Sequence, residues 1–130
     1  LQTNMNVTFS DISVEALRTK LSSFASERDW NKFHTPRNLL LALVGEVGEL
    51  SELFQWRGDA SAKPGLLDWQ QIEKNELGEE IADVFLYLIR LADVCGIDLP
   101  RAATEKLEKN RLKYPAEQCY GSSAKYTAYQ

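Results

Sequence analysis

Two acidic pairs at helical spacing are the residues in this sequence most suited to chemistry. Glu46 and Glu49 form the first pair, and Glu80 and Asp83 form the second. Residues three positions apart are neighbours on a helix surface, so each pair could hold one side of a divalent cation. Carboxylate oxygens favour Mg²⁺, Mn²⁺ or Ca²⁺ over softer metals. We therefore expect these four carboxylates to form one metal site between two packed helices.

Such a site would suit the hydrolysis of a phosphoric anhydride. Four carboxylates in one small volume repel one another, and their pKa values rise unless a cation fills the site. A bound cation can hold phosphate oxygens, and a second one can lower the pKa of a bound water until hydroxide forms. The alternative is that each pair lies on an ordinary solvated helix face. We assign Glu52, Glu73 and Glu79 to that class.

Helical periodicity predicts the elements that must position these groups. We expect an all-α protein with helices over residues 11–28, 36–56, 68 or 73 to 95, and 98–114. Thr35 should cap the second helix with Pro36 in its first turn, and Asp98 with Pro100 should begin the fourth. Asp11 or Ser13 is available to cap the first helix. Gly96 should end the third.

Apolar stripes indicate which helix faces are buried. The expected stripes are Val14, Leu17, Leu21 and Phe24 on the first helix, Leu39, Leu43, Val47, Leu50 and Phe54 on the second, and Leu77, Ile81, Val84, Leu88, Leu91 and Cys95 on the third. Glu46 falls at the edge of the second stripe, where an unpaired carboxylate would be costly, so a cation is expected beside it. Gly45 and Gly48 each weaken this helix by roughly 1 kcal/mol relative to alanine. Either a ligand or helix approaches them closely, or the helix is locally loose.

Aromatic residues flank the acidic segments and could bind a nucleobase. They are Trp30, Phe33 and His34 before the second helix, Trp56 at its end, and Tyr87 one turn beyond Asp83. Flat rings stack on any base, so selectivity would need a polar group such as His34. We assign Phe33 to the core.

The loop and the chain end offer further candidates for ligand binding. Residues 57–67, with Gly58, Pro64 and Gly65, should form a surface loop that could act as a lid. Residues 109–114 and 122–126 supply cations and hydrogen-bond donors for a polyphosphate, although lysines at 109 and 113 also suit the end of a helix.

Composition limits the class of protein and its partners. The chain has 130 residues, 44% of them hydrophobic, which fits one domain at 11–115 with tails at 1–10 and 116–130, helped by oligomerisation. A net charge of -4 argues against a nucleic-acid polymer as partner. No run reaches the roughly 18 apolar residues of a membrane span, and residues 1–10 have no signal-peptide core. Cys95 and Cys119 fit a reducing cytoplasm, and a single histidine leaves too few soft ligands for zinc.

The sequence resembles the all-α nucleoside triphosphate pyrophosphatases, the MazG-like superfamily, and within it the dCTP pyrophosphatase branch. The paired ExxE and ExxD motifs are the signature of the superfamily. The likeness to the branch rests on residues 27–30, 33–34, 36–50, 53–56, 79–84, 87–88, 98–100, 109–111, 114–115 and 125–127.

This resemblance implies a Mg²⁺-dependent hydrolase in nucleotide-pool sanitation, which converts dCTP, or 5-modified dCTP, to dCMP and pyrophosphate. The metal would be bound by Glu46, Glu49, Glu80 and Asp83, with Mn²⁺ as a substitute. A four-helix-bundle-like domain would assemble as a homotetramer in which neighbouring subunits complete each site.

The resemblance also assigns residues to the nucleotide. Trp30, Trp56 and Tyr87 would surround the base, and the sugar and phosphates would be approached by Asn110, Arg111, Tyr114, Lys125 and Tyr126. The sequence departs from the animal enzymes at Leu21, where they carry a histidine near the base, and in the loop at 57–67.

Other functions are compatible with the same residues. The fold could act on dUTP or on noncanonical purine triphosphates, or it could be a non-catalytic helical module that binds nucleotide or Ca²⁺. A ferritin-like di-iron protein would need Glu-x-x-His motifs, which His34 does not form.

Overall fold

The computed structural model describes residues 7–124 and 126–129, without the side chain of Tyr126. Within these residues the secondary structure is entirely helical, as the sequence predicts. The chain forms two compact units, one ending at Gly96 and the other beginning at Ile97. Of the helices described, none is long and apolar enough to cross a bilayer.

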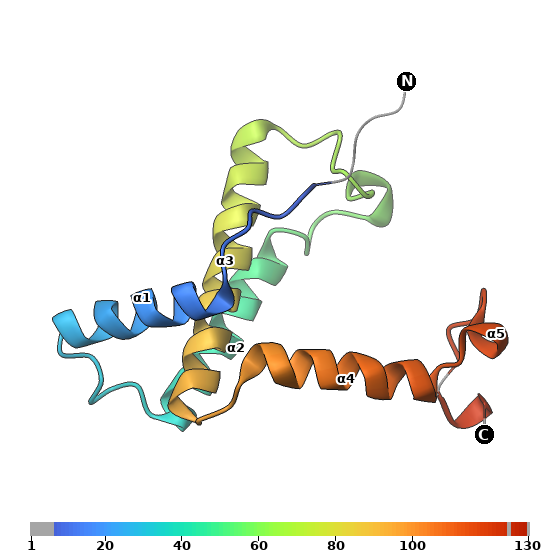
Figure 1. Ribbon diagram of the computed structural model, residues 1–130. Coiled ribbons are helices and arrows are strands. Elements are labelled where there is room, and N and C mark those ends of the chain that lie inside the picture. Colours follow the sequence, from blue (N-terminus) through green and yellow to red (C-terminus); the bar gives the residue numbers. More distant parts are fainter. Residues whose placement is uncertain (1–6, 125, 130) are drawn as a thin grey trace. The chain divides into compact units, whose positions relative to one another are not determined.

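The first unit contains three long helices, α1 (Val14–Glu27), α2 (Pro36–Glu52) and α3 (Gln71–Val94), and the short 3-10 helix η1 (Asp59–Ser61). Helix α3 packs against both α1 and α2. Helices α2 and α3 run side by side in opposite directions (Figure 1). This pairing brings the two acidic motifs of the sequence onto adjacent helices.

Local capping explains where most helices begin. The hydroxyls of Ser13 and Thr35 accept hydrogen bonds from the third backbone N–H beyond them, at 3.0 and 3.2 Å. These bonds satisfy donors that a helix start leaves unpaired. Helix α3 begins at Gln71, where the Glu73 carboxylate accepts a hydrogen bond from the backbone N–H of Gln70 at 2.8 Å.

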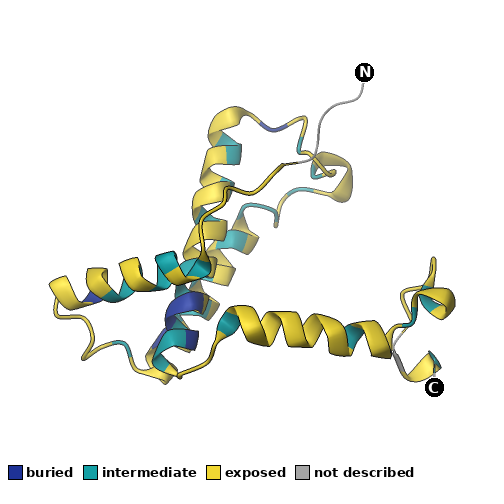
Figure 2. Ribbon diagram, in the orientation of Figure 1, coloured by how far each residue is buried: buried dark blue, intermediate teal, exposed yellow. Residues whose placement is uncertain are grey.

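The core of the first unit is small and lies along the C-terminal half of α3. Leu39 on α2 and Ile89 on α3 are each only 2% exposed, and Ala25 on α1 and Ala92 on α3 are also buried. Figure 2 shows buried segments in dark blue on the C-terminal half of α3 and a separate buried band on α1. Burial of such side chains contributes roughly 1.5–3 kcal/mol each to stability.

Several predicted core positions are exposed in this chain, so those predictions were wrong. Ile81 and Leu88 on α3, Val47 on α2 and Cys95 are exposed, and Phe33 is 58% exposed rather than part of the core. Periodicity identified the apolar faces of the helices. It could not show that other apolar residues would take the few interior positions.

The segment between α2 and α3 is longer and more ordered than predicted. Helix α2 ends at Glu52 instead of continuing to residue 56, and the connection runs to Gln70. Trp69 is buried in it, donates a hydrogen bond from its indole Nε1 to the Ser61 carbonyl at 2.8 Å, and packs against Phe54. Glu73 is not a free solvated acid, because it pairs with Arg57 at 2.8 Å.

The second unit consists of α4 (Leu99–Lys113), α5 (Ala116–Cys119) and the 3-10 helix η2 (Tyr126–Tyr129). Asp98 caps α4 by accepting a hydrogen bond from the backbone N–H of Arg101, with Pro100 in the first turn, as predicted. Short helices lie within residues 116–130, the segment that we predicted as a C-terminal tail. In the first unit, helix α3 ends just before Gly96. The backbone φ of Gly96 is 69°, a conformation that favours glycine.

Candidate metal and nucleotide site

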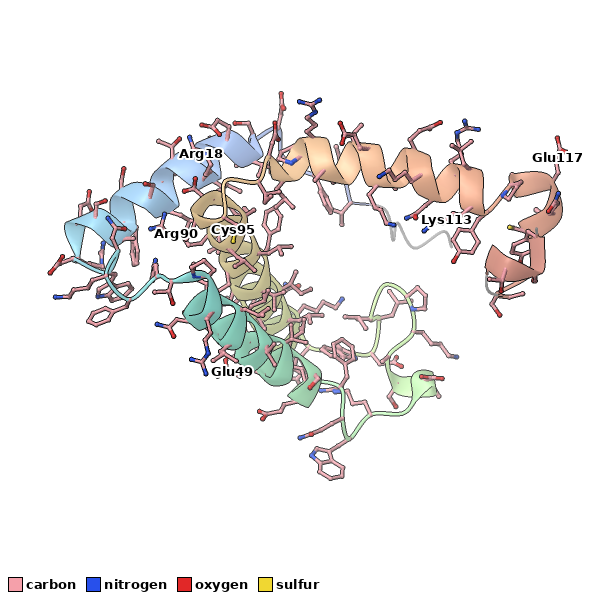
Figure 3. All side chains as sticks on the ribbon, turned by 90° about the horizontal axis from the view of Figure 1, so that it is seen from below. Arg18, Glu49, Arg90, Cys95, Lys113 and Glu117 are labelled. Atoms are coloured by element: carbon pink, nitrogen blue, oxygen red, sulfur yellow. The ribbon has the colours of Figure 1, made fainter. Side chains whose placement is uncertain are left out.

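Three of the four predicted metal ligands lie in one cluster between α2 and α3. Glu46, Glu80 and Asp83 each offer a carboxylate oxygen, and these oxygens lie within 4.8 Å of one another. Glu49 is one turn beyond Glu46 on α2 (Figure 3), and its carboxylate acts on those of both Glu46 and Glu80. The packing of α2 against α3 therefore brings all four acidic groups into one region.

Two oxygens of this acidic cluster are buried without a hydrogen-bond partner. They are Oε2 of Glu46 and Oε2 of Glu80, neither of which has a partner among the described residues. Buried polar atoms in folded proteins are nearly always paired, because an unpaired one loses its hydration without compensation. A divalent cation would supply the missing interaction. The residues present therefore fit a divalent metal bound by carboxylates.

The electrostatics of the acidic cluster lead to the same inference. Burial raises the pKa of Glu46, and the negative charges of Glu49 and Asp83 raise that pKa further. Burial also raises the pKa of Glu80, and Glu49 and Asp83 again add to the effect. Each shift reflects an environment that disfavours the ionised carboxylate. A bound cation would offset both effects, because it stabilises the ionised carboxylates.

A cavity of about 400 Å³ lies next to the acidic cluster. Its lining residues come from α1, the α1–α2 connection and α3: Leu17, Lys20, Leu21, Phe24, Trp30, His34, Asp83, Leu86, Tyr87 and Arg90. Asp83 belongs both to this lining and to the cluster. A ligand in the cavity would therefore lie beside a cation held by the carboxylates.

One wall of the cavity is aromatic. The rings of Phe24 and Trp30 meet edge to face with centroids 5.6 Å apart, and the centroids of Trp30 and His34 are 6.3 Å apart. Tyr87 follows Asp83 by one helical turn on α3 and lines the same cavity. The predicted base-binding residues Trp30, His34 and Tyr87 are thus brought together. The volume of the cavity falls in the range of small-molecule sites.

Some predicted substrate residues are not placed in this cavity. Trp56 follows the end of α2, is 88% exposed and does not line the cavity. Asn110, Arg111 and Tyr114 belong to the second unit. There the guanidinium of Arg111 pairs with Glu108 at 2.7 Å. Lys125 and the side chain of Tyr126 lie outside the described residues, so their predicted roles stay predictions.

The glycines of α2 have no close neighbour among the residues that the structure describes. A Cβ placed at Gly45 or Gly48 would meet nothing within 4 Å among the described atoms. The close helix that we offered as one explanation for these glycines is therefore not found in the described chain. The approach of a ligand or of another copy remains a prediction.

Two polar cavity residues were missed by the sequence analysis. Lys20 lies on α1, and Arg90 is a buried cation on α3. Arg90 could have been noticed as a single charge within the apolar run from Val84 to Leu91. Its partners could not have been identified, because Asn31 and His34 are distant in sequence. Leu21 also lies in the cavity wall.

Comparison with known proteins identifies the family. A model of the MazG-like family matches residues 42–128, which include both acidic motifs. The chain belongs to the MazG-like family. The membership agrees with the resemblance found in the motifs, and it accounts for two acidic pairs on packed helices.

Relatives of known name narrow the comparison within the MazG-like family. The chain is 54% identical over 115 residues to dCTP pyrophosphatase 1 of Rattus norvegicus and 52% identical over 115 residues to that of Homo sapiens. Each match covers 88% of this chain and 66% of the relative, so the chain spans about two thirds of these proteins.

A solved structure shows the same fold. A pyrophosphatase from Archaeoglobus fulgidus superposes with a TM-score of 0.70 at 39% sequence identity. The match covers 85% of this chain and 99% of the archaeal one. Most of this helical fold is therefore shared with a protein described as a pyrophosphatase.

Proposed function

We propose that this chain is a nucleoside triphosphate pyrophosphatase that converts dCTP to dCMP and pyrophosphate. The observation that carries the proposal is the unpartnered pair of buried oxygens on Glu46 and Glu80, which lies beside an aromatic cavity that shares Asp83. The identity of 50–54% to proteins named dCTP pyrophosphatase 1 supports the substrate. Removal of dCTP, or of 5-modified dCTP, from the nucleotide pool is the corresponding role.

Mg²⁺ is the proposed metal, with Mn²⁺ as a substitute, because its ligands would all be carboxylate oxygens. Glu46, Glu49, Glu80 and Asp83 would hold it. When bound, the metal neutralises charge on the phosphates and lowers the pKa of water.

The reaction is the hydrolysis of the α–β anhydride. Attack by water forms one P–O bond to a phosphorus of this linkage and breaks the bridging P–O bond, which releases dCMP and pyrophosphate. A carboxylate must accept a proton from the attacking water. Glu49 suits this role, because it is exposed and interacts with the half-buried carboxylates of Glu46 and Glu80.

The cavity would bind the base. Trp30 and Tyr87 offer rings on which a base can stack, and His34 offers a polar group at the same wall. Trp56 does not line the cavity of its own chain, and we propose that it contacts the base bound by a neighbouring subunit. Asn110, Arg111, Tyr114, Lys125 and Tyr126 are proposed to contact the sugar and the phosphates.

A homotetramer is the proposed assembly, with neighbouring subunits completing each site. The apolar stripe of Leu40, Val44 and Val47 on α2 and that of Ile81, Phe85 and Leu88 on α3 are exposed in the single chain. Such surfaces are typical of interfaces between subunits. The cytoplasm is the proposed compartment, since both cysteines in the described chain are free.

The test is the release of pyrophosphate from a panel of nucleotides in Mg²⁺ and in EDTA. We expect turnover of dCTP with Mg²⁺ and none in EDTA. Glu49→Gln and Asp83→Asn should each reduce turnover by about 100-fold or more, because each removes a site carboxylate. Glu52→Gln is the matched control, since Glu52 is an exposed acid on the same helix. Full activity in EDTA, or in both site variants, would refute the proposal.

The same panel separates the alternatives. A preference for dUTP or for a noncanonical purine triphosphate would keep the chemistry and change the substrate. Calorimetric binding of nucleotide or Ca²⁺ without turnover in any divalent ion would instead indicate a non-catalytic module.

A further inference from the structure

Arg90 is the most deeply buried charged residue among those described, and it lies at the wall of the cavity. It is 8% exposed and sits on α3 near Arg18 of α1 (Figure 3). Its guanidinium donates three hydrogen bonds, to Nδ1 of His34 at 3.0 Å, to Oδ1 of Asn31 at 2.8 Å and to Oδ2 of Asp93 at 3.2 Å. Arg90 therefore joins α3 to the aromatic segment before α2.

The bond to His34 determines where the imidazole carries its proton. An arginine is protonated at all accessible pH values and only donates. Nδ1 of His34 must therefore accept, and the proton of the neutral ring must be on Nε2. Burial lowers the pKa of His34, and the positive charge of Arg90 lowers it further, so the ring stays neutral near pH 7.

The other ring nitrogen of His34 is available to a ligand. His34 lines the cavity beside Trp30. Its only hydrogen bond to a side chain found within residues 7–124 is the one from Arg90 to Nδ1. Nε2–H is thus a hydrogen-bond donor without an acceptor among the described residues, at the wall of a site suited to a flat ring.

We propose that Arg90 is a positioning residue for base selection, which holds His34 as an Nε2–H donor toward the unprotonated N3 of a cytosine ring. Uracil and thymine carry a hydrogen on N3, so the same donor would face another donor and leave both unpaired. A site rejects a close analogue most strongly when binding of that analogue would leave a buried polar group without its hydrogen-bond partner. The inference rests on the proposed function and adds that the His34 imidazole is the group that distinguishes cytosine from uracil and thymine.

The matched control for Arg90 is Arg18. Arg18 also donates to Asp93, at 3.1 Å, but it has no hydrogen bond to His34 and does not line the cavity. Arg18→Gln therefore weakens the same α1–α3 network and leaves the imidazole untouched. Arg90→Met removes the donor to His34 while keeping an unbranched side chain in the buried position.

The first measurement is the protonation of His34 in the intact chain. His34 is the only histidine, so its two ring nitrogens give unambiguous signals in a long-range ¹H–¹⁵N NMR spectrum. We expect a protonated Nε2 and an unprotonated Nδ1 at neutral pH. A proton on Nδ1 would overturn the proposal, whatever any variant does.

The second measurement is the ratio of kcat/KM for dCTP to that for dUTP. We expect Arg90→Met to lower this ratio by about tenfold, mainly through the KM for dCTP, and Arg18→Gln to leave it unchanged. An equal loss for both nucleotides in Arg90→Met would show a purely structural role and overturn the proposal. If Arg90→Met does not fold, Arg90→Lys provides the same test, because an ammonium cannot reproduce the three-way fork of the guanidinium.

A third probe separates N3 from the 4-amino group of cytosine. The deoxynucleoside triphosphate of pyrimidin-2-one keeps the unprotonated N3 and has no 4-amino group. We expect it to be hydrolysed with the same dependence on Arg90 as dCTP. Insensitivity to Arg90→Met would contradict a contact at N3.

Failure of this inference is distinguishable from failure of the proposed function. If the unsubstituted chain hydrolyses no nucleotide, the proposed function fails. The NMR spectrum and the binding of cytidine and uridine nucleotides would still test the role of Arg90. If dCTP is hydrolysed and its preference over dUTP is independent of Arg90, the inference alone fails.

Discussion

At the scale of single residues, Glu46 and Glu80 have two properties that are unfavourable for a carboxylate in the absence of a cation. Each places an oxygen where water does not reach, and each is surrounded by other carboxylates. Both conditions disfavour the ionised form that a metal requires. The stability of the metal-free protein should therefore depend on pH in a way that Mg²⁺ removes.

This dependence has a definite sign. The pKa of Glu46 and of Glu80 is raised above the ordinary value of 4.5 in the folded chain, so the folded state binds more protons than the unfolded state above that pH. Their contribution to stability is complete below pH 4.5 and is lost as pH rises through the raised values. We expect metal-free protein to gain more thermal stability from Mg²⁺ at pH 8 than at pH 5. Scanning calorimetry at both pH values is the measurement, and an equal gain would contradict the expectation.

Removal of the charge at Glu46 should raise the stability of the metal-free protein and lower its activity. We expect Glu46→Gln to raise the thermal midpoint of the metal-free protein at pH 8, because it relieves repulsion from Glu49 and Asp83. The same variant should lose the stabilisation by Mg²⁺ and about 100-fold or more of the turnover of dCTP. Glu52→Gln should change none of these. A Glu46→Gln protein that still responds fully to Mg²⁺ would remove Glu46 from the ligand set.

At the scale of elements, Trp69 fixes the segment between α2 and α3. Its indole bonds to the Ser61 carbonyl, its ring packs against Phe54, and the guanidinium of Arg57 lies 4.1 Å from the ring centroid. Arg57 is held in turn by Glu73, whose pKa is lowered by the backbone N–H of Gln70 and by Arg57. A segment held at these points could act as a lid only after losing some of these contacts.

Trp69→Ala should therefore loosen this segment selectively. We expect a loss of about 3–5 kcal/mol in the free energy of unfolding, as for other buried aromatic residues replaced by alanine. Amide hydrogen exchange should accelerate in residues 53–70 more than at the α1–α3 contact. The exposed Trp56→Ala is the control and should cost less than 0.5 kcal/mol. Uniform acceleration throughout the first unit would contradict a local role.

The sequence predicted those elements that depend on local chemistry. Caps at Thr35 and Asp98 and the stop at Gly96 are formed by residues within a few positions, and the bounds predicted from them were correct. For the first helix we left Asp11 and Ser13 open as caps; Ser13 is the cap, so the helix begins at Val14 instead of residue 11. The two acidic pairs could also be recognised from the sequence, because i, i+3 spacing is a property of one helix.

Features that depend on distant contacts could not be predicted. Periodicity could not assign Ile81 to solvent or Arg90 to the interior, because each outcome depends on how three helices pack. The bond between Arg90 and His34 joins residues 56 positions apart. No local pattern contains that information.

At the scale of the whole molecule, the single chain leaves much apolar surface open. Val44 on α2 is 60% exposed and Ile81 on α3 is 50% exposed, while few large side chains are fully buried. Monomeric proteins rarely present contiguous apolar stripes on neighbouring helices. The proposed assembly would cover them.

The assembly can be tested by mass. We expect light scattering to give a multiple of 14.8 kDa for the chain and a lower multiple for Val44→Glu, because a charge in a buried interface is strongly unfavourable. Lys74→Glu, a change of charge elsewhere on the first unit, is the control and should leave the mass unaltered. A purely monomeric unsubstituted chain would contradict the homotetramer.

Asp83 gives the two halves of the site a common member, and this has a thermodynamic consequence. Any shift of its carboxylate toward a bound cation would alter the wall of the cavity in which we propose that a nucleotide binds, and a bound nucleotide would in turn affect the cation site. Reciprocity then requires that the ion strengthen nucleotide affinity by the same factor as the nucleotide strengthens ion affinity. The protein would therefore distinguish among bases partly through the affinity of its cation-bound form for each nucleotide.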